Sequence, residues 1–272
     1  MTSAVECQTG AMAYLNGAPA TLNDLQALAL VPYGHFTSMR ADDQHRIRGL
    51  SLHLERLQRD CRAVFDADLD VDRVRAYARQ VLDEQDGPCV VRVTVYDPAL
   101  ELGHPGADAH PSVLVTVRSA GAMPPPAMAV SSVPFSRDSA EVKHVALFGQ
   151  LKARRQAQRN GYDDALFIEA DGRVSEGGTW NIGFVAEDRT VVWPKAPVLP
   201  GVTMRLLQDM YSQTITEPVM VGDLPQLRAA FATNTSIGVR PISRIDETEF
   251  RVDDPVISDL QQHYAELPGQ VL

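Results

Sequence analysis

The hydrophobic positions between residues 50 and 82 have the spacing of two amphipathic helices. Apolar side chains recur there at helical intervals: Leu50, Leu54, Leu57, Cys61, Val64 and Phe65, then Val74, Tyr77, Val81 and Leu82. Two runs rich in β-branched residues follow, over 89–96 and 112–118, and their composition is typical of paired strands. A further strand is expected to end in a turn at Asn16-Gly17. The first part of the chain is therefore predicted to combine helices with one sheet.

A proline-rich stretch follows this part. Residues 119–126 read SAGAMPPP, and three consecutive prolines can continue neither a helix nor a central strand. We therefore predict a smaller N-terminal α/β domain over residues 1–118, a stiff linker over 119–126 and a larger C-terminal domain over 127–272.

Beyond the linker the pattern changes to short strands with few helices. Residues 148–160 predict a helix that stops at Gly161, since glycine readily adopts the left-handed backbone of a C-terminal cap. Two hairpins are predicted: 165–168 with 173–175, through a type I′ turn at Asp171-Gly172, and 181–185 with 190–193. The expected fold class is α/β with a β-rich larger lobe. A cleft between the lobes is the usual place for a small-molecule cofactor.

Composition narrows the class of protein. The chain has 272 residues, of which 44% are hydrophobic and 22% charged, as in ordinary globular proteins. Its net charge of −10 argues against a nucleic-acid-binding surface. Cys7, Cys61 and Cys89 lie far apart and lack metal-ligand spacing, so we expect no metal site. With no membrane-spanning run and no signal-peptide pattern, a cytoplasmic protein is expected.

Lys143 is the first candidate for chemistry. It is one of three lysines in a chain with 22 arginines, and it opens a segment that predicts a helix. Its apolar neighbours are Val142, Val145, Leu147 and Phe148. Such surroundings disfavour the protonated amine and make a lysine nucleophilic. Taken alone, a lysine that begins a surface helix is the commoner alternative.

Two later segments supply groups that complement an amine. Glu176 precedes Gly177-Gly178, and a carboxylate at a pyridine nitrogen keeps that nitrogen protonated. Residues 199–203 (LPGVT) precede an apolar helical pattern, and free N–H groups at a helix start bind phosphate. Separately these are an ordinary turn acid and an ordinary capped helix. Together with Lys143 they are the groups that hold pyridoxal 5′-phosphate (PLP).

The order and spacing of these segments resemble the class IV aminotransferases, the fold-type IV PLP enzymes. This family includes D-amino acid and branched-chain aminotransferases and aminodeoxychorismate lyase. The similar segments are residues 143–157 (Schiff-base lysine and following helix), 161–166, 176–181, 199–203, 53–57 (HLERL), 231–241 and 34–40. The resemblance runs from about residue 14 to residue 241.

The resemblance implies that Lys143 is the catalytic residue and forms a Schiff base with PLP. The cofactor-binding residues that it implies are Lys143, Glu176, Arg56, Gly201, Val202, Thr203 and Thr235. The candidate substrate-binding residues are Arg40, Tyr33, His35, Tyr96 and Trp180. A homodimer is also implied, acting on a small-molecule amino donor and an oxo-acid acceptor.

The departures from the family pattern concern the substrate. D-amino acid aminotransferases carry a carboxylate-gripping arginine near residue 96, where this chain reads TVYD over residues 94–97. Phe148 takes the position of a tyrosine in branched-chain enzymes, and Thr37 that of a glutamate. Arg40 is then the first candidate for the substrate carboxylate. Arg92 is expected to point away from Tyr33, His35 and Tyr96 or to make a structural ion pair.

Three functions follow from this reading. The leading one is a PLP-dependent aminotransferase that works by a ping-pong Schiff-base mechanism. The second is a lyase of the 4-amino-4-deoxychorismate type, which eliminates pyruvate with the same lysine and needs no oxo-acid acceptor. The third is a non-catalytic PLP-binding homologue.

Overall fold

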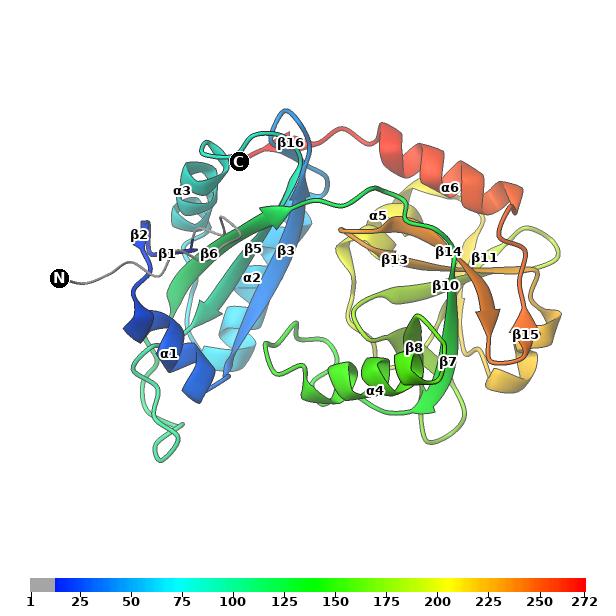
Figure 1. Ribbon diagram of the computed structural model, residues 1–272, viewed down its shortest axis with the longest axis horizontal. Helices are drawn as coiled ribbons and strands as arrows, with labels where there is room; N and C mark the ends of the chain where they lie inside the picture. Colours follow the sequence, from blue (N-terminus) through cyan, green and yellow to red (C-terminus); the bar gives the residue numbers. More distant parts are fainter. Residues whose placement is uncertain (1–12) are drawn as a thin grey trace. The chain divides into compact units, whose positions relative to one another are not determined.

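The computed structural model describes residues 13–272, so Cys7 lies outside the described residues. The chain divides into two compact units (Figure 1). Unit 1 contains the residues up to Ala120 together with Lys143–Ala146 and Pro268–Leu272, and unit 2 contains Gly121–Val142 and Leu147–Leu267. Two short segments of the sequence-predicted C-terminal domain thus belong to unit 1, and one of them carries Lys143.

Unit 1 is built on a sheet of seven strands among the described residues. Their order is β16-β4-β3-β5-β6-β1-β2, and neighbouring strands are antiparallel. The strands are β1 (Ala13–Leu15), β2 (Ala18–Pro19), β3 (Gly34–Ala41), β4 (Arg46–Ile47), β5 (Cys89–Tyr96), β6 (Ser112–Ser119) and β16 (Gln270–Val271). The helices are α1 (Leu22–Leu30), α2 (Leu50–Phe65) and α3 (Val71–Leu82).

Helices α2 and α3 cover one face of this sheet, which confirms the two predicted helices. Leu57 of α2 and Val74 of α3 share a buried core with Met39, Val91 and Val93 of the central strands. Burial of such apolar faces contributes most of the stabilisation of the unit. The opposite face of β3 and β5 carries Phe36 and Arg92, on alternate positions of the pleat.

Unit 2 contains a nine-stranded sheet among the described residues, and its strands are short as predicted. The strands are β7 (Met128–Pro134), β8 (Asp164–Ile168), β9 (Val174–Gly177), β10 (Asn181–Val185), β11 (Val191–Pro194), β12 (Thr214–Glu217), β13 (Ala229–Asn234), β14 (Gly238–Ile245) and β15 (Thr248–Glu249). The helices are α4 (Phe148–Arg159), α5 (Val202–Met210), α6 (Pro255–Glu266) and the 3₁₀ helix η1 (Val221–Gln226).

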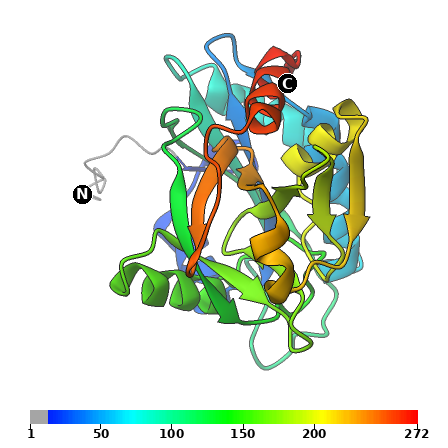
Figure 2. The same cartoon turned by 90° about the vertical axis from the view of Figure 1, so that its right-hand side faces the viewer.

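Six strands of unit 2 form a closed ring. Strand β10 pairs with β13, the path continues through β14, β7, β8 and β9, and β9 returns to β10 through the pair Glu176–Asn181. Apolar side chains such as Leu166 and Ile182 form one buried core of this unit. Residues of helices α5 and α6 form a second buried core together with Phe231. Figure 2 shows α4 (green), α5 (yellow) and α6 (red) around the strands.

Both predicted hairpins are present, but the turn type of the first is wrong. Gly172 has φ 85° while Asp171 does not have positive φ, so the two-residue type I′ turn is absent there. The N–H of Gly172 instead donates to the carbonyl of Glu169 at 2.9 Å. The central residues of the turn are therefore 170 and 171, and Gly172 follows them, so the connection is longer than a two-residue turn. A turn with two positive φ values occurs at Asn16-Gly17, where a strand end was expected.

Helix α4 begins at Phe148, five residues after Lys143, so the prediction that Lys143 opens a helix is wrong. It ends with Gly161 at φ 84°, as its sequence predicts. None of the helices described for residues 13–272 is long and apolar enough to cross a membrane.

Candidate active site

The segment that carries Lys143 is held by the edge of strand β3. The N–H of Phe36 donates to the Lys143 carbonyl at 2.8 Å, and the N–H of Val145 donates to the Gly34 carbonyl at 2.9 Å. The Lys143 N–H itself donates to Oδ2 of Asp60 on α2 at 3.0 Å. These contacts use the backbone groups that a helix would need, which is why the helix starts only later.

The Lys143 amine lies beside an aromatic ring that also contacts an arginine. Its Nζ is 4.9 Å from the centroid of the Phe36 ring, and Cζ of Arg92 is 3.6 Å from the same centroid. Arg92 and the Lys143 amine therefore both lie near the Phe36 ring. By strand register Arg92 is on the same face of the sheet as Tyr96, which contradicts that part of the prediction, and on the opposite face from His35, as expected. The expected apolar surroundings are also wrong in part, since Phe148 is 80% exposed.

Arg56 lies in a buried polar cluster on α2. Its Nη2 donates to Oγ1 of Thr37 and lies 3.3 Å from Nδ1 of His53. Burial lowers the pKa of Arg56 to about 10, although the negative charge of Asp60 acts to raise it. The guanidinium therefore stays charged at neutral pH. Burial and then the positive charges of Arg56 and Lys143 hold the pKa of His53 well below its usual range. Within residues 13–272, Nε of Arg56 has no hydrogen-bond partner.

Glu176 is a buried carboxylate with a donor on each oxygen. Its Oε1 accepts Nη1 of Arg137 at 2.7 Å, and its Oε2 accepts the N–H of Leu199 at 3.1 Å. Nδ2 of Asn181 donates to the Leu199 carbonyl at 2.8 Å and lies 3.4 Å from Oε2. Hydrogen bonds of this kind favour the ionised form of a carboxyl group.

The start of helix α5 has no side-chain cap and packs closely against Asn181. Gly201 is its N-cap and provides no side-chain cap, so the first N–H groups of the helix remain for another acceptor. A Cβ atom at Gly201 would lie 2.0 Å from Oδ1 of Asn181, so no other residue fits without displacement. Val202 and Thr203 follow and are buried.

Two threonines lie at the end of strand β13. Thr235 is partly buried, directly after the strand. Thr233 is fully buried and pairs in register with Asn181 of β10, and among the described residues its Oγ1 has no hydrogen-bond partner. A buried hydroxyl without a partner is costly in an apolar interior. Thr233 is therefore a candidate for ligand contact that the sequence motifs did not indicate.

Each unit, taken by itself, contains residues whose chemistry fits PLP. Unit 1 contributes the Lys143 amine and a charged, buried guanidinium on Arg56. Unit 2 contains the Glu176 carboxylate, with a hydrogen-bond donor on each oxygen, and a helix start at Gly201 that has no side-chain cap, where N–H groups suit a phosphate.

The candidate substrate residues differ in their surroundings. Arg40 lies on β3 two residues beyond Ser38 on the Phe36 face, and among the described residues its buried Nη1 has no partner. The Tyr33 hydroxyl donates to the Val64 carbonyl at 3.0 Å, and the Tyr96 hydroxyl to the Asp24 carbonyl at 2.9 Å.

Two further candidates are buried. His35 packs against Phe65 of α2, on the helix-covered side of the sheet. Trp180 donates its indole N–H to Oδ2 of Asp164 at 2.8 Å. Among the described residues, Nη1 of Arg40 and both ring nitrogens of His35 are buried without a hydrogen-bond partner, whereas the hydroxyls of Tyr33 and Tyr96 and the indole N–H of Trp180 bond within the protein.

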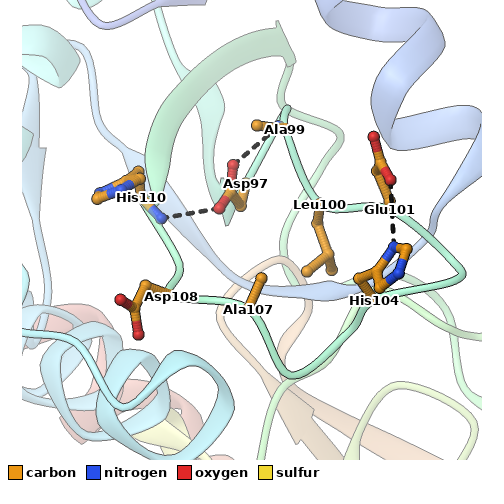
Figure 3. Close-up of a pocket in the computed structure, with 8 residues that line it drawn as sticks. All are labelled: Asp97, Ala99, Leu100, Glu101, His104, Ala107, Asp108 and His110. Atoms are coloured by element: carbon orange, nitrogen blue, oxygen red, sulfur yellow. Dashed lines mark hydrogen bonds and ion pairs between the residues drawn. The ribbon is translucent and has the colours of Figure 1, made fainter.

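A separate small hollow lies in the loop after β5 (Figure 3). The carboxylate of Asp97 accepts the N–H groups of Ala99 at 2.8 Å and His110 at 2.7 Å, and so organises the loop itself. Nδ1 of His104 lies 3.4 Å from Oε2 of Glu101, and both side chains are largely exposed. Over the described part of the chain, no group of three or more potential ligands is arranged to hold a metal ion.

Comparison with known proteins supports a single family. The family model of class IV aminotransferases matches residues 34–245. A probable branched-chain-amino-acid aminotransferase of Rickettsia felis is 29% identical over 144 residues, which are 50% of this chain and 48% of that protein. The chain thus spans about half the length of the curated relatives it matches.

Solved structures of low sequence identity share the fold. The branched-chain amino acid aminotransferase of Escherichia coli has a TM-score of 0.83 at 16% identity, covering 96% of this chain and 98% of that one. A hypothetical aminotransferase from Mycobacterium tuberculosis, in its PLP-bound form, has a TM-score of 0.77 at 17% identity, covering 93% and 97%. The family match extends over more than half of the sequence and includes Lys143, Glu176 and residues 199–203. The chain therefore belongs to the class IV aminotransferase family.

Proposed function

We propose that the protein is a PLP-dependent aminotransferase that moves an amino group between an amino acid or amine and a 2-oxo acid. The arrangement around Lys143 carries this proposal. Its backbone is bonded to Asp60 and Phe36, and its amine lies over a ring that also contacts a guanidinium.

Each proposed cofactor residue has a distinct task. When bound, the cofactor supplies an aldehyde and an electron-accepting ring. Lys143 provides the amine that captures the aldehyde and, when neutral, moves the proton at the substrate Cα. Glu176 holds a proton on the ring nitrogen. We assign the binding of the phosphate to Arg56, to Thr235 and to the start of α5, which comprises Gly201, Val202 and Thr203.

The substrate acid group requires a cation. Arg40 and Arg92 both lie on the Phe36 face of the unit 1 sheet, and we assign the substrate carboxylate to them. This assignment adds Arg92 to the residues expected from sequence. The predictions for Tyr33, His35, Tyr96 and Trp180 stay predictions, as do the homodimer, the cytoplasmic location and the two-domain division.

Borohydride reduction of the PLP-treated protein tests the proposal. The chain has three lysines, so peptide mapping distinguishes Lys143 from Lys152 and Lys195 without ambiguity. We expect the reduced adduct on Lys143 alone and loss of turnover in Lys143→Ala, while Lys152→Ala retains both. An adduct on another lysine, or none, contradicts the proposal.

The amino donors named for relatives set the first substrates to test. Branched-chain amino acids come first, because the similar Rickettsia protein is named for them. Transamination requires an oxo-acid acceptor. Pyruvate release from aminodeoxychorismate without an acceptor would identify the lyase, and binding of PLP without turnover of any donor would identify a non-catalytic homologue.

A further inference from the structure

Arg137 lies at the centre of the contacts around Glu176. Its side chain is 7% exposed, and its Nη1 is 2.7 Å from Oε1 of Glu176, whose side chain is 5% exposed. Two neutral groups also lie within hydrogen-bond distance of this carboxylate, the Leu199 N–H and the Asn181 amide. Arg137 places a positive charge directly against the buried carboxylate.

The same guanidinium also binds the backbone that leads to Lys143. Nη1 donates to the Ala140 carbonyl at 2.9 Å, and Nη2 donates to the Val142 carbonyl at 2.9 Å. The Val142 carbonyl belongs to the peptide group whose N–H is that of Lys143, and this N–H donates to Asp60. The planar fork of arginine can make these contacts together, whereas a lysine ammonium has no such geometry.

A carboxylate with this partner behaves differently from one without it. Removing one member of a buried ion pair leaves an uncompensated charge, and a buried carboxyl group then takes up a proton more readily. A protonated Glu176 could no longer keep the proton on a pyridine nitrogen. Loss of the Val142 contact would also free the peptide that positions Lys143.

We infer that Arg137 is a positioning residue of the PLP site, which keeps Glu176 ionised and fixes the peptide group preceding Lys143. This inference rests on the proposed function. It predicts two separable effects of the same side chain, one on the charge of the carboxylate and one on the Lys143 segment.

Pyridoxamine 5′-phosphate is a suitable probe, because it lacks the aldehyde and cannot bond covalently to Lys143. Its absorbance and affinity report on the non-covalent contacts of its ring, amine and phosphate. Wild-type protein, Arg137→Met and Arg137→Lys are titrated with it over a range of pH. Arg228→Met is the matched control, since Arg228 also pairs with a buried carboxylate, that of Asp254.

We expect Arg137→Met to bind the probe about tenfold more weakly, the loss of one hydrogen bond between charged groups. Its bound spectrum changes as the pH falls, because Glu176 becomes protonated, while the wild-type spectrum does not change there. Hydrogen exchange over residues 136–146 becomes faster. Arg137→Lys restores the spectrum in part but not the slow exchange, and Arg228→Met resembles wild type in all three measurements.

Unchanged probe affinity, pH profile and exchange in Arg137→Met overturn the inference. If that variant does not fold, Arg137→Lys decides, since wild-type affinity and exchange there contradict the need for the guanidinium fork. Failure of the proposed function looks different. In that case the wild-type protein itself binds neither pyridoxamine 5′-phosphate nor PLP.

Discussion

The Oδ2 atom of Asp60 accepts the backbone N–H of Lys143 at 3.0 Å, although the two residues are 83 positions apart in the chain. Asp60 is fully buried, and its other oxygen accepts Nε and Nη2 of Arg59. The carboxylate thereby connects helix α2 to the segment that carries the proposed catalytic amine.

Replacing Asp60 by Ala should lower the free energy of unfolding by about 1–3 kcal/mol, because the partly buried Lys143 N–H loses its acceptor and Arg59 loses its ion-pair partner. Asp60→Asn should cost less, since its amide oxygen can still accept this hydrogen bond. Urea unfolding followed by circular dichroism measures both. Equal losses in the two variants would mean that the Arg59 pair, and not the Lys143 contact, is what Asp60 provides.

A side chain at Gly201 should disturb the start of helix α5. In Gly201→Ala the new Cβ meets Oδ1 of Asn181 at 2.0 Å, so Asn181 must move away from Glu176 and Leu199. We expect a loss of about 1–3 kcal/mol in stability and weaker binding of PLP. Gly222→Ala is the control, because a Cβ there meets nothing within 4 Å among the described residues. Equal PLP affinity in both variants would contradict the tight approach at Gly201.

The buried His35 should make stability depend on pH. Burial lowers the pKa of His35 to about 4, with Asp60 opposing and Arg56 adding to the shift. Its pKa in an unfolded chain is about 6.5, so between these values the unfolded state binds more protons than the native state. The stability that the neutral His35 contributes is therefore fully present above about pH 6.5. The free energy of unfolding falls by up to about 3 kcal/mol as the pH approaches 4.

Substituting His35 by Leu should flatten this part of the pH profile, since the variant has no imidazole to protonate there. Urea unfolding at a series of pH values gives the comparison. The exposed His263 serves as a control, and His263→Gln should keep the wild-type slope. A slope unchanged in His35→Leu would show that other groups, such as the buried His53, account for the dependence.

Arg92 should affect substrate binding and leave the covalent step intact. In Arg92→Met we expect KM for a carboxylate-bearing donor to rise about 10–100-fold, which corresponds to the loss of one charged hydrogen bond. Reduction by borohydride should still label Lys143. Arg73→Met is the matched control, because Arg73 also lies over an aromatic ring, that of Tyr77. A normal KM in Arg92→Met would assign the carboxylate to Arg40 alone.

The sequence predicted those parts of the fold that depend on local patterns. The helices over residues 50–65 and 71–82 follow from an apolar repeat that is complete within each segment. The glycine at position 161 indicates a helix end for a similar reason. The closed ring of unit 2 could not be predicted in this way, since it is completed by the single register pair Glu176–Asn181.

The site shows the same division. Lys143, Glu176 and residues 199–203 could be proposed from the sequence because the motifs and their spacing are present in it. The conformation at Lys143 was predicted wrongly, because hydrogen bonds to Phe36, Gly34 and Asp60 outweigh local helix preference. Arg92 could have been placed by strand alternation, as it lies two residues from Thr94, the partner of Phe36. Arg137 gave no signal, since an isolated arginine in a loop belongs to no periodic pattern.

The single backbone pair that joins β9 to β10 also has a consequence for solubility. Strand edges with unsatisfied N–H and C=O groups recruit foreign strands. If a change at Asn181 released this pair, β9 and the first residues of β10 would present such an edge. Variants made to probe the carboxylate should therefore be checked for self-association, because aggregation could imitate a loss of cofactor.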